Sequence, residues 1–354
     1  MNYKNSIVQN DMKELADQSD IPVNLLQNKK ILITGANGML ATYLIYFFMY
    51  LNEKKHLDIE IFAVSRNKKK AEERFQFFLA DDRFHLLIGD VCNRLEIGNK
   101  KNIDYIIHAA GNASPHFIMN DPVGIIKANT LGTLNVLEFA KENNCSRVLY
   151  TSTREIYGAL PESVKLISEE KYGVINPTQL RNCYPESKRL SETLLESYRF
   201  QYNIEYVTVR IAHSYGPGMT IENDGRVMAD FISDTIHERN IVLKSKGEME
   251  RAFCYITDAV SGILFALLVG QSGNSYNLAN ETEPISVRKV AELLVQLFPG
   301  TDRKVEFKIP EQADEGYSKI ERTKLDTRKL EALGWKSRIA LKEGLTRTVQ
   351  SFKE

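Results

Sequence analysis

The sequence predicts an α/β protein built on a doubly wound parallel sheet, with a smaller α+β lobe toward the C-terminus. Short apolar runs rich in β-branched residues alternate with longer helix-like segments up to about residue 215. One of these runs leads directly into a glycine-rich turn. The chain has 354 residues, which suits one large domain or two interlocked ones.

The first predicted strand and helix flank that glycine turn. Lys29-Lys-Ile-Leu-Ile-Thr-Gly35 is a short apolar strand, and Gly35-Ala-Asn-Gly38-Met-Leu-Ala41 follows it. Gly35 permits the tight turn, Gly38 lets the backbone approach a pyrophosphate at the helix N-terminus, and Ala41 allows close packing of helix on strand. The context predicts a dinucleotide site. The apolar run 39–51 is shorter than the roughly 20 residues of a membrane span, so we expect a buried core helix.

Further strands and helices follow in alternation, as a parallel Rossmann sheet requires. The predicted strands are Ile59–Ser65, Phe84–Ile88, Tyr105–His108, Val148–Thr153 and Tyr206–Ile211. The predicted helices lie near Lys68–Phe78, Val123–Asn143 and Glu186–Tyr202. After Gly216-Pro-Gly218 the pattern loosens into an amphipathic stretch at Val227–Arg239, a strand and helix within Phe253–Leu268, and helices near Val287–Leu297 and Thr327–Leu333.

This pattern predicts three regions. Residues 1–29 form an extension, either a packed arm or a partly disordered segment, and residues 30–215 form the dinucleotide-binding domain. Residues 216–354 form a substrate-binding lobe, with part of 250–280 returning to the sheet.

Composition and charge limit the classes of molecule that the protein is expected to bind. Lys plus Arg number 46 and Asp plus Glu also number 46, so no net field attracts nucleic acid or an anionic membrane. The four cysteines are scattered without metal-ligand spacing, and the N-terminus lacks the pattern of a signal peptide. We therefore expect a cytoplasmic protein with no metal site, acting on a small ligand.

The most informative motif is Tyr184-Pro-Glu-Ser-Lys188. Residues four apart on a helix share one face, so the phenol and the ammonium can act as one acid–base unit. An ammonium favours the phenolate and should lower the pKa of Tyr184 from its ordinary value of roughly 10. Such a base is what hydride transfer from an alcohol needs.

Six motifs from Lys29 onward belong together: Thr34-Gly-Ala-Asn-Gly38, Gly89-Asp-Val91, His108-Ala-Ala110, Thr151-Ser-Thr-Arg-Glu-Ile-Tyr-Gly158, Tyr184–Lys188 and Arg210-Ile-Ala-His-Ser-Tyr-Gly-Pro217. With them the chain resembles the extended short-chain dehydrogenases/reductases of the nucleotide-sugar epimerase, dehydratase and decarboxylase group. Three later segments, Asn223-Asp-Gly-Arg-Val227, Arg251-Ala-Phe-Cys-Tyr-Ile-Thr-Asp258 and Leu333-Gly-Trp335, most resemble UDP-glucuronate decarboxylases.

The resemblance implies catalytic roles. Tyr184 would take the proton of a sugar 4-hydroxyl, Lys188 would hold Tyr184 ionised, and Thr153 would hydrogen-bond the same oxygen. In the 4,6-dehydratases an Asp and a Glu follow that threonine, whereas here they are Arg154 and Glu155. An arginine is a poor general acid, so Arg154 counts against dehydration, and Glu155 fits either chemistry. Arg154 could also be a surface charge that points away from the ligand.

The resemblance also implies binding residues. Ser65 and Arg66 replace the acidic residue that would accept the 2′-hydroxyl of NAD, so we expect NADP, with NAD as the alternative. The expected cofactor site comprises Gly35, Asn37, Gly38, Met39, Leu40, Ser65, Arg66, Asp90, Val91, Ala109, Ala110, Tyr184 and Lys188. The expected sugar-nucleotide site comprises Arg154, Arg181, His213, Arg226, Arg251 and Arg322, where His213 replaces the family's usual Asn.

Several alternatives stay open. A 4-epimerase or a 4,6-dehydratase acting on another nucleotide sugar would use the same residues, and a catalytically silent dinucleotide-binding regulator would keep the fold. The resemblance further implies a homodimer that pairs the helices near Val123–Asn143 and Glu186–Tyr202, with Leu190, Leu194 and Leu195 on the second helix.

Overall fold

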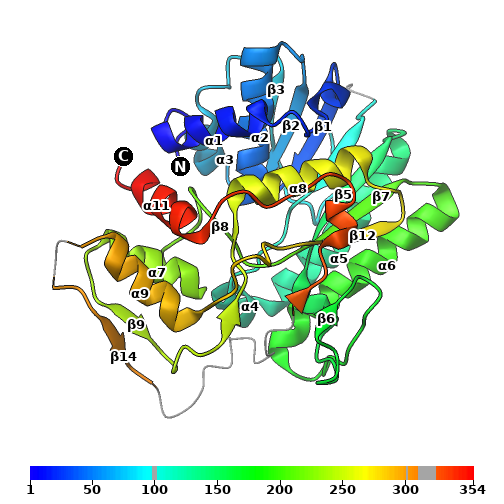
Figure 1. Cartoon of the computed structure of the whole chain (residues 1–354). Helices are drawn as coiled ribbons and strands as arrows, with labels where there is room; N and C mark the ends of the chain where they lie inside the picture. Colours follow the sequence, from blue (N-terminus) through cyan, green and yellow to red (C-terminus); the bar gives the residue numbers. More distant parts are fainter. Residues whose placement is uncertain (98–101, 300–301, 310–323) are drawn as a thin grey trace.

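A computed structural model describes residues 1–97, 102–299, 302–309 and 324–354. Its centre is a seven-stranded parallel sheet in the order β3-β2-β1-β4-β5-β7-β12, which confirms the predicted fold class (Figure 1). The strands are β1 (Lys30–Thr34), β2 (Glu60–Ser65), β3 (Phe84–Ile88), β4 (Tyr105–His108), β5 (Arg147–Thr153), β7 (Tyr206–Ile211) and β12 (Asn274–Leu278).

Helices cover both faces of the sheet. Successive residues of a strand face opposite sides, so Ile31 and Ile33 enter one core and Leu32 enters the other. The first core contains α2 (Met39–Lys55), α3 (Lys68–Phe75) and α8 (Ile256–Val269). The second contains α5 (Pro122–Glu142) and α6 (Cys183–Tyr202), which pack along each other.

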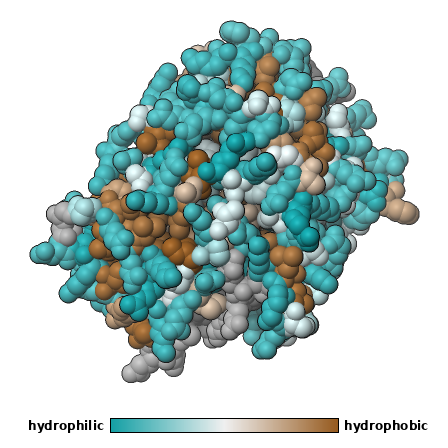
Figure 2. Space-filling view, in the orientation of Figure 1, coloured by the Kyte–Doolittle hydropathy of each residue, from teal (hydrophilic) through white to brown (hydrophobic). Residues whose placement is uncertain are grey.

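The C-terminal lobe lies beyond the carboxyl ends of the strands, beside α4 (Pro115–Asn120) (Figure 1). Figure 2 shows apolar side chains gathered around α7 and α9 on a mostly hydrophilic face. The lobe contains α7 (Val227–Ile236), β9 (Ile241–Leu243), β10 (Glu250–Arg251), β13 (Ile285–Ser286), α9 (Val287–Leu297) and β14 (Val305–Phe307).

The other elements outside the central sheet are mostly short. They are η2 (Arg154–Tyr157), β6 (Leu166–Ile167), η3 (Leu180–Asn182), β8 (Ser214–Tyr215), β11 (Cys254–Tyr255), β15 (Lys324–Leu325), α10 (Arg328–Glu331) and α11 (Leu341–Ser351). In the parts of the chain that the structure describes, none of the helices has both the length and the apolarity of a membrane span.

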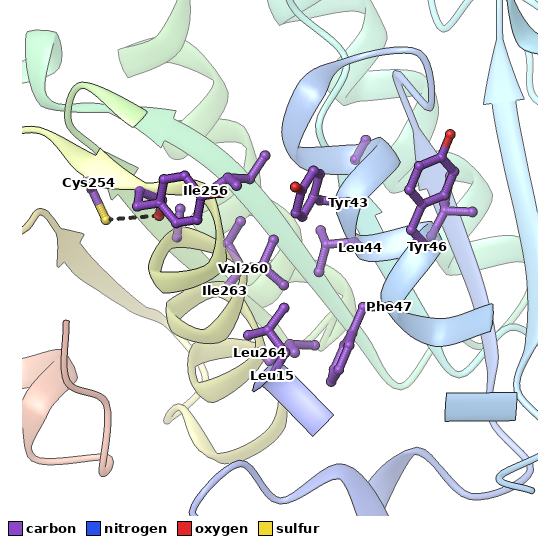
Figure 3. Close-up of a cluster of buried hydrophobic side chains, with 14 of the residues drawn as sticks. Leu15, Tyr43, Leu44, Tyr46, Phe47, Cys254, Ile256, Val260, Ile263 and Leu264 are labelled. Atoms are coloured by element: carbon purple, nitrogen blue, oxygen red, sulfur yellow. Dashed lines mark hydrogen bonds between the residues drawn. The ribbon is translucent and has the colours of Figure 1, made fainter. Parts of the chain in front are cut away.

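The N-terminal extension is a packed arm rather than a loose tail. It contains α1 (Ser6–Asp17) and η1 (Val23–Leu26), and Figure 3 shows Leu15 of α1 among apolar side chains of α2 and α8. The buried carboxylate of Asp11 accepts hydrogen bonds from Tyr43 of α2 and Tyr255 of β11, each 2.8 Å long, and pairs with Arg347 of α11. The arm therefore links α2, which packs on the sheet, to the C-terminal helix α11.

Candidate active site

The glycine turn has the shape that a dinucleotide needs. Gly35 has φ +68°, and a Cβ there would lie 2.8 Å from backbone atoms of Ala109 and Ala110. α2 begins directly after Gly38, and this N-cap glycine has no side chain to bond the first N–H groups of the helix. An uncapped helix N-terminus behind a close glycine turn suits a pyrophosphate. The residues present therefore fit the expected cofactor.

The adenosine end of this predicted site lies at the ends of β2 and β3. Asn37 Nδ2 donates to Ser65 Oγ at 2.6 Å, while Asn37 Oδ1 has no partner among the described residues. The exposed Arg66 guanidinium lies 3.5 Å from the Asp90 carboxylate. The carbonyl of Val91 accepts from Asn135 of α5 at 2.8 Å, which fixes the loop that follows β3.

The predicted acid–base residues meet where β5 ends and α6 begins. Thr153 is the last residue of β5, and Tyr184 lies in the first turn of α6, which starts three residues earlier than the sequence predicted. Burial, followed by the negative charge of Glu155, raises the pKa of Tyr184, whereas Thr153 and the positive charges of Arg181 and Arg226 act to lower it. These five groups therefore lie close enough to influence one another.

Lys188 is almost completely buried one helical turn after Tyr184. Its Nζ donates to the carbonyl of Thr151 at 2.8 Å and lies 4.5 Å from the ring centroid of Tyr150. Burial lowers the pKa of Lys188 to about 7. The pKa of Tyr184 is raised rather than lowered as the sequence predicted, because burial is the largest influence on it and Lys188 is not among the five largest. Sequence spacing gives the shared helix face but not the depth of burial.

Lys188 should make the free energy of unfolding depend on pH. The pKa of Lys188 is 10.5 in the unfolded chain and about 7 in the folded chain, so folding disfavours its charged form. Above pH 10.5 the lysine is neutral in both states and does not lower the free energy of unfolding. As the pH falls, it lowers this free energy increasingly, and the loss is complete once the pH has fallen through about 7. Lys188→Met should therefore be more stable than the wild type by up to a few kcal/mol near pH 6, with a smaller gain near pH 9. Urea denaturation at both pH values measures the difference in free energy of unfolding between variant and wild type. An equal difference at both pH values would contradict the lowered pKa of Lys188.

Three of the expected sugar-nucleotide residues are arginines close to Thr153 or Tyr184. Arg181 pairs with Glu155, and Arg226 pairs with the buried Asp224, with Nε–Oδ1 2.5 Å and Nη2–Oδ2 2.9 Å. Arg154 is half-buried in η2 between Thr153 and Glu155.

The other two described residues, His213 and Arg251, lie on or next to short strands. His213 accepts a backbone hydrogen bond from Cys254 at 3.2 Å, and Arg251 lies on β10, where its Nη1 donates to the carbonyl of Glu250. Arg322 lies outside the described residues. The ligand contacts of all six residues stay predictions.

The sequence analysis missed Asn129, which is buried in α5. Its Nδ2 donates to Ser187 Oγ at 2.9 Å, and its Oδ1 has no partner among the described residues. A Cβ on Gly111 would lie 2.8 Å from Asn129 Oδ1 and 3.5 Å from Lys188 Nζ, so the amide and the ammonium are close. A buried polar atom without a partner next to a site often binds an ordered water. A polar residue within a helix otherwise gave no signal in the sequence.

The chain is similar in sequence to known proteins. The model of the NAD dependent epimerase/dehydratase family matches residues 31–279. UDP-glucuronic acid decarboxylase 6 of Arabidopsis thaliana is 33% identical over 327 residues, which cover 92% of this chain and 89% of the relative. UDP-glucuronic acid decarboxylase 1 of Xenopus tropicalis is 35% identical over 338 residues, which cover 94% and 75%.

Solved structures share the fold. The UDP-glucuronic acid 4-epimerase of Bacillus cereus, in complex with UDP-glucuronic acid and NAD, gives a TM-score of 0.74 at 19% identity. The match covers 92% of this chain and 99% of that one. At this identity the likeness establishes the architecture alone.

Proposed function

Because the chain belongs to the NAD dependent epimerase/dehydratase family, we propose that it oxidises a nucleotide sugar at C4 and that its substrate is UDP-glucuronate. The observation that carries the redox chemistry is that Thr153 lies beside Tyr184, while Lys188 lies beside Gly111, the residue after the Ala109 and Ala110 backbone that the Gly35 turn contacts. The decarboxylase relatives support the choice of sugar. A silent regulator has no chemical need for all three side chains.

In the proposed reaction, Tyr184 takes the proton of the sugar 4-hydroxyl, and Thr153 donates a hydrogen bond to the same oxygen. A bound nicotinamide would supply the acceptor for the hydride of C4. A positive charge on Lys188 favours loss of the Tyr184 proton, against the burial that raises the pKa of this phenol. Arg226, oriented by Asp224, and Arg251 are the proposed partners of the diphosphate.

A ketone at C4 makes the C6 carboxylate of glucuronate a β-keto acid, which can lose carbon dioxide. Arg154 stands where a dehydratase would need an acid for the leaving 6-hydroxyl, and a guanidinium stays protonated. Decarboxylation has no hydroxyl leaving group, so it needs no acid at that position. Arg154 therefore favours decarboxylation over 4,6-dehydration.

The product mass tests this proposal. We expect incubation with UDP-glucuronate to give a nucleotide sugar lighter by one carbon dioxide, while UDP-glucose and dTDP- or CDP-sugars serve as comparison substrates. Loss of water from one of the comparison sugars would instead indicate a dehydratase. An unchanged mass with inversion at C4 would indicate an epimerase.

We also propose that the cofactor is NADP rather than NAD. The exposed guanidinium of Arg66 lies at the end of β2, and the stretch Ser65-Arg66-Asn67 contains no acidic residue that would repel a 2′-phosphate. The family description, which names NAD, supports the alternative, in which Arg66 contacts the adenine and serves both cofactors alike.

Arg66→Asp should reverse the cofactor preference. A charge-assisted bond to the 2′-phosphate contributes on the order of 1.5–3 kcal/mol, so the ratio of the two affinities should change about tenfold or more. Titration of wild type and variant with NADP and NAD measures that ratio, and Arg83→Asp is a control with the same change of charge. NAD alone in the extract of the denatured protein would contradict the proposal.

We propose that α5 and α6 form a homodimer interface. Exposed apolar side chains lie on both helices: Val123, Ile126 and Leu131 on α5 and Leu190 on α6, whereas Leu195 faces the core and Leu194 is half-buried. Leu190→Asp should convert a dimer to a monomer in sedimentation at micromolar concentration, because it places a charge at an apolar contact. Phe307→Asp, at a similarly exposed position of the C-terminal lobe, should not. A monomeric wild type would disprove the interface.

A further inference from the structure

Glu155 and Arg181 form a two-point ion pair between η2 and η3. Glu155 Oε1 accepts from Arg181 Nη2 at 2.9 Å, and the other carboxylate oxygen is in still closer contact with Nη1. The side chains are 25% and 14% exposed, respectively. Since a guanidinium presents its donors as a rigid fork, both carboxylate oxygens are engaged at once.

This pair lies beside the reacting groups. The amide N–H of Glu155 donates to Thr153 Oγ at 3.2 Å, and Arg181 lies three residues before Tyr184. The two charges act on the Tyr184 phenol in opposite directions. A carboxylate in this position would therefore lie near a sugar whose 4-oxygen is held by Thr153 and Tyr184.

This inference depends on the proposed function. In the proposed reaction, a carboxylate at this position without an ion-pair partner would cause a side reaction. The 4-ketone acidifies the proton on C5, and a nearby carboxylate could remove it as a general base. The resulting enolate would return a solvent proton to C5 or expel a group from C6. To act as that base, Glu155 must first break a partly buried pair with a guanidinium that stays protonated.

We propose that Arg181 is a positioning residue that withholds Glu155 from C5, so that the ketone loses carbon dioxide without prior loss of the C5 proton. In that step the C5–C6 bond breaks, its electron pair forms the C4–C5 enolate, and carbon dioxide leaves. The enolate then takes a proton from water at C5. The C4 ketone is finally reduced by the hydride that was removed from C4 earlier.

Deuterium exchange tests the role of Arg181 separately from the overall reaction. The probe is UDP-4-ketopentose, incubated in heavy water with protein loaded with the oxidised cofactor, so that the ketone is not reduced. Exchange at C5 then reports only a base near that carbon. It is followed by NMR against a protein-free sample, and calorimetry checks that each protein binds the probe.

We expect wild-type protein to leave exchange at the protein-free rate and Arg181→Gln to raise it at least about tenfold. The double variant Arg181→Gln/Glu155→Gln should return it to the protein-free rate. If Arg181→Gln fails to fold, Arg181→Lys replaces it as the test, because lysine keeps the charge but cannot bond both carboxylate oxygens as a guanidinium does. This variant should also exchange the C5 proton faster than wild type. Rapid exchange by wild type, or no increase in the folded single variants, would overturn the proposal. Failure to decarboxylate UDP-glucuronate would instead count against the proposed function.

Discussion

Tyr184→Phe should lower turnover by about 10²–10⁴-fold while leaving the fold and cofactor binding intact, because it removes the base and keeps the ring. The ring of Tyr184 packs with Ile118 and Ile125, and phenylalanine retains these contacts. Single-turnover reduction of the cofactor by the sugar nucleotide measures the step directly. Calorimetric titration with NADP and NAD then shows whether the cofactor still binds.

Tyr198→Phe is the matched control on the same helix. It makes the same chemical change 14 residues later, about 21 Å along α6, where the hydroxyl bonds Glu138. The control should keep near-normal turnover. If a folded Tyr184→Phe protein also turned over normally, another group would have to remove the proton.

The strands of this fold could be predicted closely from sequence because parallel strands buried on both faces are short apolar runs. The predicted Phe84–Ile88, Tyr105–His108 and Tyr206–Ile211 match β3, β4 and β7 residue for residue. The starts and ends of helices were less accurate. α6 begins at Cys183 and includes Pro185, since a proline in the first turn lacks only an N–H that would have no helical partner.

The site could be predicted only as separate residues. Motifs gave Thr153, Tyr184 and Lys188, because each lies in a local pattern of strand end or helix spacing. They gave Arg181 as a sugar-nucleotide ligand but did not give its pairing with Glu155, because the two residues lie 26 positions apart. Local periodicity carries no information on such partners or on how deeply Tyr184 is buried.

The same limit applied to the N-terminal arm, whose sequence is polar and sparsely apolar. Asp11 bonds Tyr255 across 244 positions and Arg347 across 336 positions, and only the folded chain brings these groups together. A buried acid that is bonded to two hydroxyls and a guanidinium holds the elements that carry these groups together. Removing it should therefore release the arm.

Asp11→Ala should lower the free energy of unfolding by about 2–4 kcal/mol, because it leaves the buried hydroxyls of Tyr43 and Tyr255 without their acceptor. Arg347 keeps Glu14 and Glu343, so its own charge stays compensated and the loss should not be larger. Urea denaturation measures the change, and limited proteolysis shows whether residues 1–29 become accessible.

Asp11→Asn separates the hydrogen bonds from the charge. Its amide oxygen can still accept from the tyrosines, so we expect a smaller loss than for alanine. Asp17→Ala removes an exposed acid of the same helix that pairs with the exposed Lys13, and it should change little. If Asp11→Ala were no less stable than Asp17→Ala, apolar contacts such as those of Leu15, rather than Asp11, would hold the arm in place.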